Sequence, residues 1–317
     1  MGALMRTAAV HAFGPPEELV PTDLPIPDIT ADEVLVQVRT AGVQPVDAGV
    51  RQGWLIPGAP SPSFPLVPGN ECAGTVVAVG DTVQRFAVGD DVIGFRMLGC
   101  YAEFAAIRAN QAVKKPAALT WDVAGVLSAS GQTADTAIED LAIGDGDTVV
   151  VHGAAGGVGT VFTQLAQRRG ATVIGIASEP NHRYLRELGA IPVAYGAGLI
   201  DRVRNVAPRG VAPRGVAPRG VDAVLDAAGH DSLHVAVEVA NDLTRVATIA
   251  DPDLADELGV AMLRSRRSAE RLQRLAQLAV SAELQIHVRR SFPLERAVDA
   301  HRELETGHGR GKMVLAL

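Results

Sequence analysis

The clearest chemical pattern is the glycine-rich segment Val149-Val-Val-His-Gly-Ala-Ala-Gly-Gly-Val-Gly159. β-Branched residues typical of a buried parallel strand run into a tight turn, and a helix is predicted over residues 158–169. A helix N-terminus offers unpaired N–H groups and a partial positive charge to phosphate, and glycine permits close approach of the backbone. The pattern predicts a dinucleotide pyrophosphate site at Ala154, Ala155, Gly156, Gly157, Val158 and Gly159, with Ala154 replacing the first of the usual three glycines.

The residues after the next predicted strand indicate which dinucleotide the turn accepts. That strand, residues 171–177, is followed by Ser178, and Arg183 lies about one helical turn further on. An NAD site usually has Asp or Glu here to bind the ribose 2′-hydroxyl, whereas a hydroxyl and a guanidinium suit a 2′-phosphate. We therefore expect NADP(H) over NAD. Glu179 can favour either nucleotide, and a solvated helix-face cation is the alternative interpretation of Arg183.

Strands and helices alternate around this segment. Helices are predicted at residues 123–141 and 182–188, and further buried strands at 221–226 and 244–250. The alternation predicts βαβ units and a doubly wound parallel sheet of the Rossmann type. Residues 1–120 carry short strands between turns instead, among them the alternating Glu33-Val-Leu-Val-Gln-Val-Arg39, which is typical of a mainly-β module.

The last part of the chain resumes a mixed pattern. Residues 263–282 predict an amphipathic helix, followed by a strand at 284–290, a helix at 293–304 and an apolar terminal strand at 313–317. We expect the terminal strand to pair with the mainly-β module. The arginines of the first helix are expected to form a solvated face; they are Arg264, Arg266, Arg267, Arg271 and Arg274.

A tandem repeat interrupts the alternating part. Val-Ala-Pro-Arg-Gly occurs three times in residues 206–220. Proline and glycine exclude a helix or a central strand, and a five-residue period matches no solenoid. We predict a surface loop between a helix and the strand at residue 221; the alternative is that its three arginines contact an anionic ligand.

Composition excludes several classes of protein. The chain has 317 residues, 47% hydrophobic, which favours two folded domains over disorder. Its net charge of −7 argues against binding to nucleic acid or to an anionic membrane. Two cysteines are too few for a disulfide scaffold or a four-cysteine zinc site. No secretory signal or membrane span is apparent, so a cytoplasmic protein is expected.

Motifs in order along the chain resemble the zinc-independent medium-chain dehydrogenases/reductases of the quinone oxidoreductase (zeta-crystallin-like) group. Besides the glycine-rich segment, the matching motifs are Gly42-Val-Gln-Pro-Val-Asp47, Pro68-Gly-Asn-Glu-Cys-Ala-Gly74, Gly89-Asp-Asp-Val92, Tyr101-Ala-Glu-Phe104, Gly131-Gln-Thr-Ala134, Leu188-Gly-Ala190 and Gly311-Lys-Met-Val-Leu315. The matches run from Gly42 to Leu315 and so cover most of the chain.

The resemblance implies a GroES-like substrate domain over residues 1–120, a Rossmann domain over 121–262 and a return to the first domain over 263–317. It implies an active-site cleft between the domains, with Gln44 and Thr133 beside the nicotinamide and in catalytic roles. Ser178, Arg183 and Tyr195 would surround the adenosine phosphate, and Ala228 would be a further coenzyme contact. Members of the group commonly form homodimers through edge strands, for which residues 244–250 are the candidate.

The zinc ligands of related enzymes are replaced in this chain. Gln44 stands where those enzymes have cysteine, and Asn70 stands in place of the histidine of a Gly-His-Glu motif. Amides are not usual ligands of Zn²⁺, and Cys72 lies two residues past the required position. We therefore expect no metal. Gln44 also replaces the asparagine usual in quinone reductases of the group, which changes the reach of its amide.

Without a Lewis acid, an acceptor that is already polarised is favoured over an unactivated alcohol. The sequence predicts hydride transfer from NADPH to a quinone or an electron-poor C=C, with Gln44 and Thr133 as hydrogen-bond donors and Tyr101 as a weaker third. Two alternatives stay open at this point. One is an enoyl-thioester or polyketide-type reductase, and the other is an NADPH-binding sensor without turnover.

Three further polar residues have structural interpretations. Asp47 is expected to fix a loop, and the alternative is that it shuttles protons. Glu71 is expected to be the buried partner of a basic group or to line the cleft, and His152 to be a hydrogen-bonded core histidine.

Overall fold

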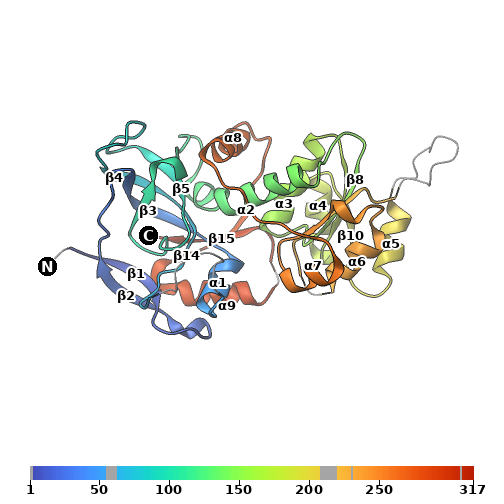
Figure 1. Ribbon diagram of the computed structural model, residues 1–317, viewed down its shortest axis with the longest axis horizontal. Coiled ribbons are helices and arrows are strands. Elements are labelled where there is room, and N and C mark those ends of the chain that lie inside the picture. The colour runs from blue at the N-terminus through green and yellow to red at the C-terminus, as the bar shows by residue number, and fades with distance from the viewer. Residues whose placement is uncertain (1–2, 55–62, 208–219, 230, 308) are drawn as a thin grey trace. The chain divides into compact units, whose positions relative to one another are not determined.

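The computed structural model describes residues 3–54, 63–207, 220–229, 231–307 and 309–317 (Figure 1). The chain divides into two compact units: a split unit, Met1–Ala129 with Arg267–Leu317, and a central unit, Ser130–Arg266. The limits predicted at residues 120/121 and 262/263 refer to the family's domains rather than to these compact units, and they stay a prediction. None of the described helices has the length and apolar content that crossing a bilayer requires.

The split unit contains a ribbon and a larger sheet. In the ribbon, β1 (Leu4–Val10) pairs antiparallel with β2 (Leu19–Pro25). Within the described residues the larger sheet has seven strands in the order β14-β15-β3-β4-β5-β7, with β6 paired to β3 outside this path. Their bounds are β3 Glu33–Val43, β4 Glu71–Val79, β5 Asp91–Phe95, β6 Phe104–Arg108, β7 Ala112–Lys114, β14 Val288–Pro293 and β15 Lys312–Ala316.

The alternation along β3 explains its place in this sheet. Val34, Val36 and Val38 are at most 2% exposed, because every second side chain of a strand faces the core. At its far end β3 pairs antiparallel with β15, where Met313 faces Val43. The terminal strand therefore returns to the mainly-β module, as predicted. The helices of this unit are α1 (Pro45–Arg51), α8 (Ala269–Val280), α9 (Ala297–Glu305) and the first part of α2 (Trp121–Asp140).

The central unit contains a parallel sheet. Within the described residues its strand order is β10-β9-β8-β11-β12-β13. The strands are β8 Thr148–His152, β9 Thr172–Ile176, β10 Ile191–Val193, β11 Ala223–Asp226, β12 Val246–Thr248 and β13 Ala261–Met262. The accompanying helices are α3 Gly157–Arg168, α4 His182–Glu187, α5 Leu199–Val206, α6 Ser232–Val239 and α7 Pro252–Leu258.

Numbered along the chain, this order is 3-2-1-4-5-6, the doubly wound arrangement of dinucleotide-binding folds. The central strand β8 has Val149, Val150 and Val151 fully buried, which explains why its sequence is continuously apolar rather than alternating. The strand order reverses between β8 and β11, the place where ligands of such sheets bind. The predicted fold class, a Rossmann sheet inserted in a mainly-β unit, is confirmed.

Several predicted elements begin later than expected, among them a helix and a strand in the last part of the chain. Helix α8 begins at Ala269 rather than at residue 263, because the Ser268 hydroxyl caps it by accepting a hydrogen bond from Arg271 N at 3.1 Å. The expected solvated arginine face was therefore partly wrong, since Arg264, Arg266 and Arg267 precede the helix. The strand predicted at residues 284–290 is β14, which starts at Val288.

The strand predicted at residues 244–250 is shorter and lies inside the sheet. Residues 243–245 form a 3-10 turn, and only Val246–Thr248 are extended as β12. Because β12 pairs with β11 on one side and β13 on the other, it has no free edge for a second copy of the chain. The choice of this strand for dimer pairing was wrong; β13 is the edge strand on this side.

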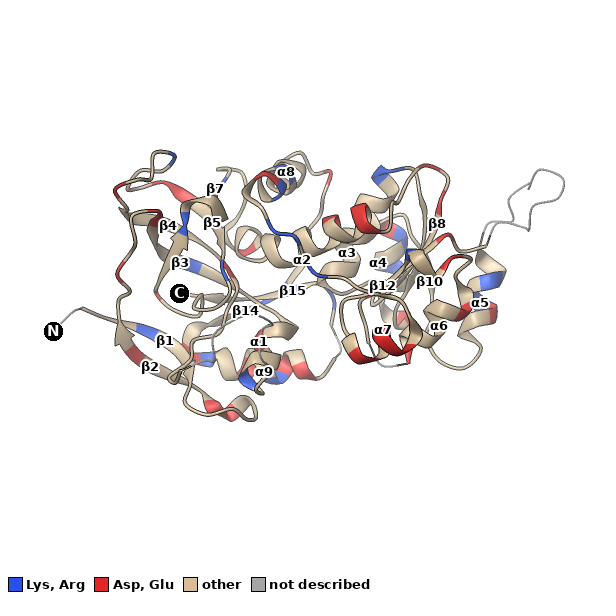
Figure 2. Cartoon of the chain, viewed as in Figure 1, with Lys and Arg blue, Asp and Glu red and all other residues tan. Residues whose placement is uncertain are grey.

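The tandem repeat lies almost wholly outside the described residues, since residues 208–219 are not among them. Acidic side chains gather on α7, where Asp253, Asp256 and Glu257 are exposed (Figure 2). Such a surface repels phosphate polyanions, in line with the negative net charge.

Candidate active site

The glycine turn lies between β8 and α3. Gly153 has a φ of +69°, which favours glycine, and Gly156 is the N-cap of α3. Gly159 sits against the turn: a Cβ added there would lie 2.3 Å from Gly153 O and 2.7 Å from Ala154 Cα. Both neighbours are backbone, so only glycine lets the helix pack this closely on the strand.

This turn fits a dinucleotide pyrophosphate. The N–H groups at the start of α3 have no partner within the helix, and the 12-residue helix directs its positive end toward the turn. Ala154 and Ala155 are buried beneath it, while Gly156, Gly157 and Val158 are half-buried. The predicted pyrophosphate residues thus form one continuous turn at the carboxyl end of the central strand.

The residues expected around the adenosine phosphate follow β9 and β10. Ser178 is half-buried and its Oγ accepts a hydrogen bond from Asn181 Nδ2 at 3.0 Å. Arg183 has 89% of its side chain exposed and pairs with Glu187 at 2.8 Å, and Tyr195 is 57% exposed. No carboxylate follows β9 directly, because Glu179 begins the next 3-10 turn one residue later. Their contacts with a coenzyme stay a prediction.

Ala228 lies in the loop after β11, which Asp226 holds in place. One carboxylate oxygen of Asp226 accepts the N–H groups of Ala228 and Gly229 at 3.0 and 3.1 Å and the Ser232 hydroxyl at 2.6 Å. The other accepts the Thr248 hydroxyl at 2.7 Å. Asp226 therefore organises the carboxyl edge of β11 and β12.

His152 ends β8 directly before the turn. It is 2% exposed, and burial lowers its pKa to about 4, so the ring is neutral. Its Nε2 has no hydrogen-bond partner within the described structure. The prediction that His152 lies in the core is confirmed, and Nε2 makes no hydrogen bond there to any described residue.

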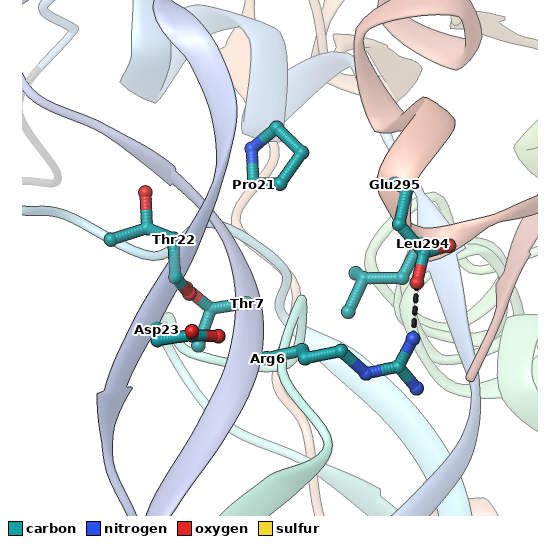
Figure 3. Close-up of a pocket in the computed structure, with 7 residues that line it drawn as sticks. All are labelled: Arg6, Thr7, Pro21, Thr22, Asp23, Leu294 and Glu295. Carbon is teal, nitrogen blue, oxygen red and sulfur yellow. Dashed lines mark hydrogen bonds and ion pairs between the residues drawn. The ribbon is translucent and has the colours of Figure 1, made fainter.

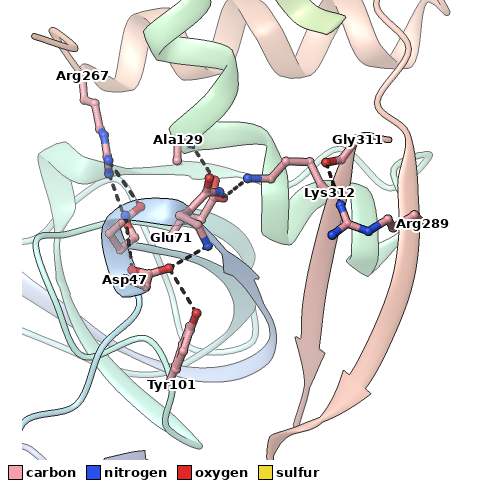
Figure 4. A network of polar contacts seen from close by, with 10 residues as sticks. Asp47, Glu71, Tyr101, Ala129, Arg267, Arg289, Gly311 and Lys312 are labelled. Atoms are coloured by element: carbon pink, nitrogen blue, oxygen red, sulfur yellow. Dashed lines mark hydrogen bonds and ion pairs between the residues drawn. The ribbon is translucent and has the colours of Figure 1, made fainter. Parts of the chain in front are cut away.

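The split unit contains a buried polar cluster that includes Asp47, Glu71 and Lys312 (Figure 4), and Gln44 belongs to it through Glu71. Gln44 is 5% exposed and precedes α1, and its Nε2 donates to Glu71 Oε1. Glu71, 1% exposed on β4, also accepts the Ala129 N–H at 2.6 Å. Lys312 Nζ on β15 lies 3.7 Å from Glu71 Oε1 and supplies the basic partner that was predicted for Glu71.

Asp47 forms the second half of this cluster. It is fully buried, and Oδ2 accepts the backbone N–H of Gln44 at 2.9 Å and the Tyr101 hydroxyl at 3.1 Å. Burial raises the pKa of Asp47 to about 7. Burial also raises the pKa of Tyr101 and lowers that of Lys312. Asp47 fixes the loop of Gln44, as predicted.

Arg267 completes the cluster from the segment before α8. Its guanidinium donates to Asn70 O at 3.1 Å and Asn70 Oδ1 at 3.3 Å. Two buried carboxylates thus face two cations, because Asp47 and Glu71 lie in the same group as Arg267 and Lys312. The helical spacing of Arg267 predicted a place on the solvated face of a helix. No role was predicted for Lys312, although Lys312 stands in the motif Gly311-Lys-Met-Val-Leu315.

The donor set of the cluster does not fit a zinc ion. Gln44 and Asn70 present amides, and the oxygens of Glu71 accept N–H groups. In the described parts of the chain, no group of three or more His, Cys, Asp or Glu side chains could hold a metal ion. Cys72 and Cys100 are free and buried.

Thr133, the other predicted catalytic residue, lies on α2 in the central unit and is half-buried. Gln44 belongs to the split unit. Their roles beside a nicotinamide stay a prediction.

A pocket of about 200 Å³ opens elsewhere, beside the β1–β2 ribbon (Figure 3). Arg6 lines it and is paired with Glu103 at 2.8 Å and with Glu295. None of the predicted site residues lines this pocket.

Comparisons with known proteins show the family of the chain. Residues 30–117 match the alcohol dehydrogenase GroES-like domain, and residues 200–315 match the zinc-binding dehydrogenase family. Quinone oxidoreductase from Rattus norvegicus is 30% identical over 99% of this chain and 98% of that protein. The chain belongs to the quinone oxidoreductase group of the medium-chain dehydrogenases/reductases.

Solved structures of this group share the fold over the whole chain. The quinone oxidoreductase from Coxiella burnetii is 29% identical with a TM-score of 0.86, covering 99% of this chain and 100% of that one. A mycobacterial protein complexed with NADPH is 27% identical with a TM-score of 0.83, at the same coverage. Although one matching family is named for zinc binding, the donor set around Gln44 does not fit that ion in this member of the group.

Proposed function

We propose that this oxidoreductase uses NADPH to reduce a quinone or an electron-poor C=C, without zinc. The observation that carries the proposal is the approach of Gly159 to the backbone of Gly153, which puts the N-terminus of α3 at the carboxyl end of the central strand. That arrangement suits a pyrophosphate, and the 27% identical mycobacterial relative is complexed with NADPH.

The residues after β9 support NADPH over NADH. Ser178 offers a hydroxyl and Arg183 an exposed guanidinium, which is able to leave Glu187 because an exposed i,i+4 pair is worth only about 0.3–0.5 kcal/mol. A 2′-phosphate forms stronger, charge-assisted hydrogen bonds with guanidinium. Tyr195 is exposed enough to lie along the adenosine.

When bound, NADPH supplies a hydride. This chain's own residues then have to orient the acceptor and stabilise the charge that develops on its oxygen. Gln44 Nε2 carries two N–H groups, of which one donates to Glu71, so the second serves the carboxamide or the substrate carbonyl. Thr133 supplies a hydroxyl donor, and the proton that completes a hydroquinone or saturated ketone comes from water.

The zinc-free reaction is supported by the chemistry of the cluster. Amides at Gln44 and Asn70 are poor ligands for Zn²⁺, and Glu71 is already held by Lys312 and by the Ala129 N–H. An amide donor polarises an enone or quinone carbonyl, which delocalises incoming charge onto its own oxygen. It does not lower the pKa of an unactivated alcohol as a metal ion does.

Two measurements test the proposal. Purified protein should show a larger thermal shift with NADPH than with NADH, and it should oxidise NADPH with members of a panel of quinones and α,β-unsaturated ketones. Binding without oxidation by any acceptor would favour the sensor alternative. Activity confined to enoyl thioesters would favour the thioester reductase, and a preference for NADH would overturn the reasoning from Ser178 and Arg183.

We further propose a cytoplasmic homodimer that binds neither nucleic acid nor membranes. The acidic net charge supports the absence of binding to nucleic acid and to membranes. Among the described strands β13 is the outermost, and its open edge supports a homodimer, since an open parallel edge can continue into a second sheet. Sedimentation velocity of the wild type and of a Met262→Pro variant tests it. The Leu263 N–H donates to Thr248 O inside the sheet, so the N–H of the preceding Met262 faces the open edge, and proline there removes that donor.

A further inference from the structure

A histidine of the split unit that has no part in the proposed reaction is buried in a chain of hydrogen bonds leading to Gln44. His301 lies on α9 and is fully buried. Its Nδ1 is 3.3 Å from Arg51 Nε, at the end of α1, and its Nε2 is 3.3 Å from Tyr101 Oη. The rings of Tyr101 and His301 meet edge to face, with centroids 5.8 Å apart.

The partners of His301 fix its tautomer. A guanidinium only donates, so Nδ1 must accept and the ring proton must be on Nε2. The Nε2–H then donates to Tyr101 Oη, whose hydroxyl proton is left to donate to Asp47 Oδ2 at 3.1 Å. The same Asp47 oxygen accepts the Gln44 N–H at 2.9 Å. Burial and the neighbouring Arg51 lower the pKa of His301 to about 3, so the ring stays neutral.

This series of hydrogen bonds ends at the helix that follows Gln44. Arg51 is fully buried, and its guanidinium also donates to Gly14 O and to Glu305. Because Gln44 precedes α1 and Arg51 ends it, both ends of this short helix are tied to each other through His301 and Tyr101. This series of hydrogen bonds holds its side chains in place but does not conduct protons, because the Arg51 guanidinium at its end gives up no proton near neutral pH.

We infer that His301 is a positioning residue for Gln44, acting through Tyr101 and Asp47 in its Nε2–H tautomer. This inference rests on the proposed role of Gln44 as a hydrogen-bond donor, taken here as directed to the carbonyl of the acceptor rather than to the nicotinamide carboxamide. A displacement of about 1 Å at a reacting group can cost about a hundred-fold in rate, so a loosened Gln44 loop should lower kcat. The coenzyme turn belongs to the central unit, so NADPH affinity should not change.

The first measurement does not depend on activity. Long-range ¹H–¹⁵N correlation spectra of the wild type should show His301 as the neutral Nε2–H tautomer from about pH 5 to about pH 9. The His301→Gln variant assigns the resonance by its disappearance. An Nδ1–H tautomer, or a ring that becomes charged within that range, would overturn the inference even if the enzyme is active.

The second measurement compares variants by kcat with a quinone and by NADPH affinity. His301→Leu removes one hydrogen-bond partner each from Arg51 and Tyr101, whereas Gln at this position offers both an acceptor and a donor. We expect kcat to fall about ten-fold or more in His301→Leu and in Tyr101→Phe, with NADPH Kd unchanged and recovery of most of kcat in His301→Gln. The double variant should be no worse than the worse single one.

The control is His234→Leu, at an exposed histidine on α6, which should leave both kcat and NADPH Kd unchanged. If His301→Leu lowers the melting temperature but keeps kcat per NADPH-binding site within about two-fold, His301 is merely structural and the inference is wrong. Should His301→Leu fail to fold, kcat of Tyr101→Phe and His301→Gln decides in the same way. A wild-type enzyme that reduces no acceptor refutes the proposed function instead, which the spectra distinguish.

Discussion

Replacing Gly159 by alanine tests the coenzyme turn in depth. The added Cβ would lie 2.3 Å from Gly153 O, against an ordinary contact of about 3.5 Å, so α3 must withdraw from the turn by about 1 Å. Overpacking of this kind costs about 1–3 kcal/mol of folding free energy. Withdrawal also lengthens the hydrogen bonds from the helix N-terminus to a pyrophosphate, each worth about 1.5–3 kcal/mol.

Losing one such bond weakens NADPH binding by about ten-fold or more, since about 1.4 kcal/mol is a factor of ten. The assay is a fluorescence titration of NADPH, with thermal unfolding of the free protein alongside it. Gly144→Ala is the matched control, because a Cβ at Gly144 meets nothing within 4 Å. It should leave NADPH Kd unchanged. Wild-type NADPH affinity in Gly159→Ala would refute the assignment of this turn to the pyrophosphate.

Three further predictions concern charged groups. Because burial raises the pKa of Asp47 to about 7 from an ordinary value near 3.9, its contribution to stability is present below about pH 4 and is lost as pH rises through about 7. In urea unfolding, the free energy of unfolding of Asp47→Asn minus that of the wild type should therefore be about 2–3 kcal/mol larger at pH 8 than at pH 5. A difference that does not change with pH would contradict this. Ser178→Asp should raise NADPH Kd about ten-fold or more in a fluorescence titration while NADH Kd does not rise, because a carboxylate repels the 2′-phosphate; equal effects on both coenzymes would count against it. Lys312→Met should lower the free energy of unfolding by about 3–5 kcal/mol by leaving Glu71 buried without its cation, and Glu71→Gln in the same chain should restore most of it; no restoration would argue against the pairing.

The parallel sheet could be predicted directly from the sequence. The run Thr148–His152 is continuously apolar because β8 is covered on both faces, and the glycines after it have no other common use between a strand and a helix. The terminal strand was likewise predictable from its apolar residues, which β15 buries against β3.

Strand order and helix starts were harder to predict. Nothing in residues 244–250 tells that β13 will cover the edge of β12, because pairing in a parallel sheet depends on crossovers. The start of α8 depends on one hydroxyl, that of Ser268, which outweighed the helical spacing of the preceding arginines.

The buried cluster around Gln44 was also hard to predict from the sequence. Its members come from positions 47, 71, 101, 267 and 312, and their contacts are made by tertiary packing rather than by local spacing. The sequence could mark Gln44 and Asp47 by their motif, but it could not tell that His301, more than two hundred residues away, closes a chain of hydrogen bonds on them.

The most direct test of the proposed reaction is the rate of quinone-dependent NADPH oxidation by protein that has been dialysed against a strong chelator and checked for metal content. We predict that the rate is the same before and after dialysis, at a zinc content far below one ion per chain. No oxidation of NADPH with any quinone or enone, or an activity that is lost on dialysis and returns with added zinc, would contradict the account.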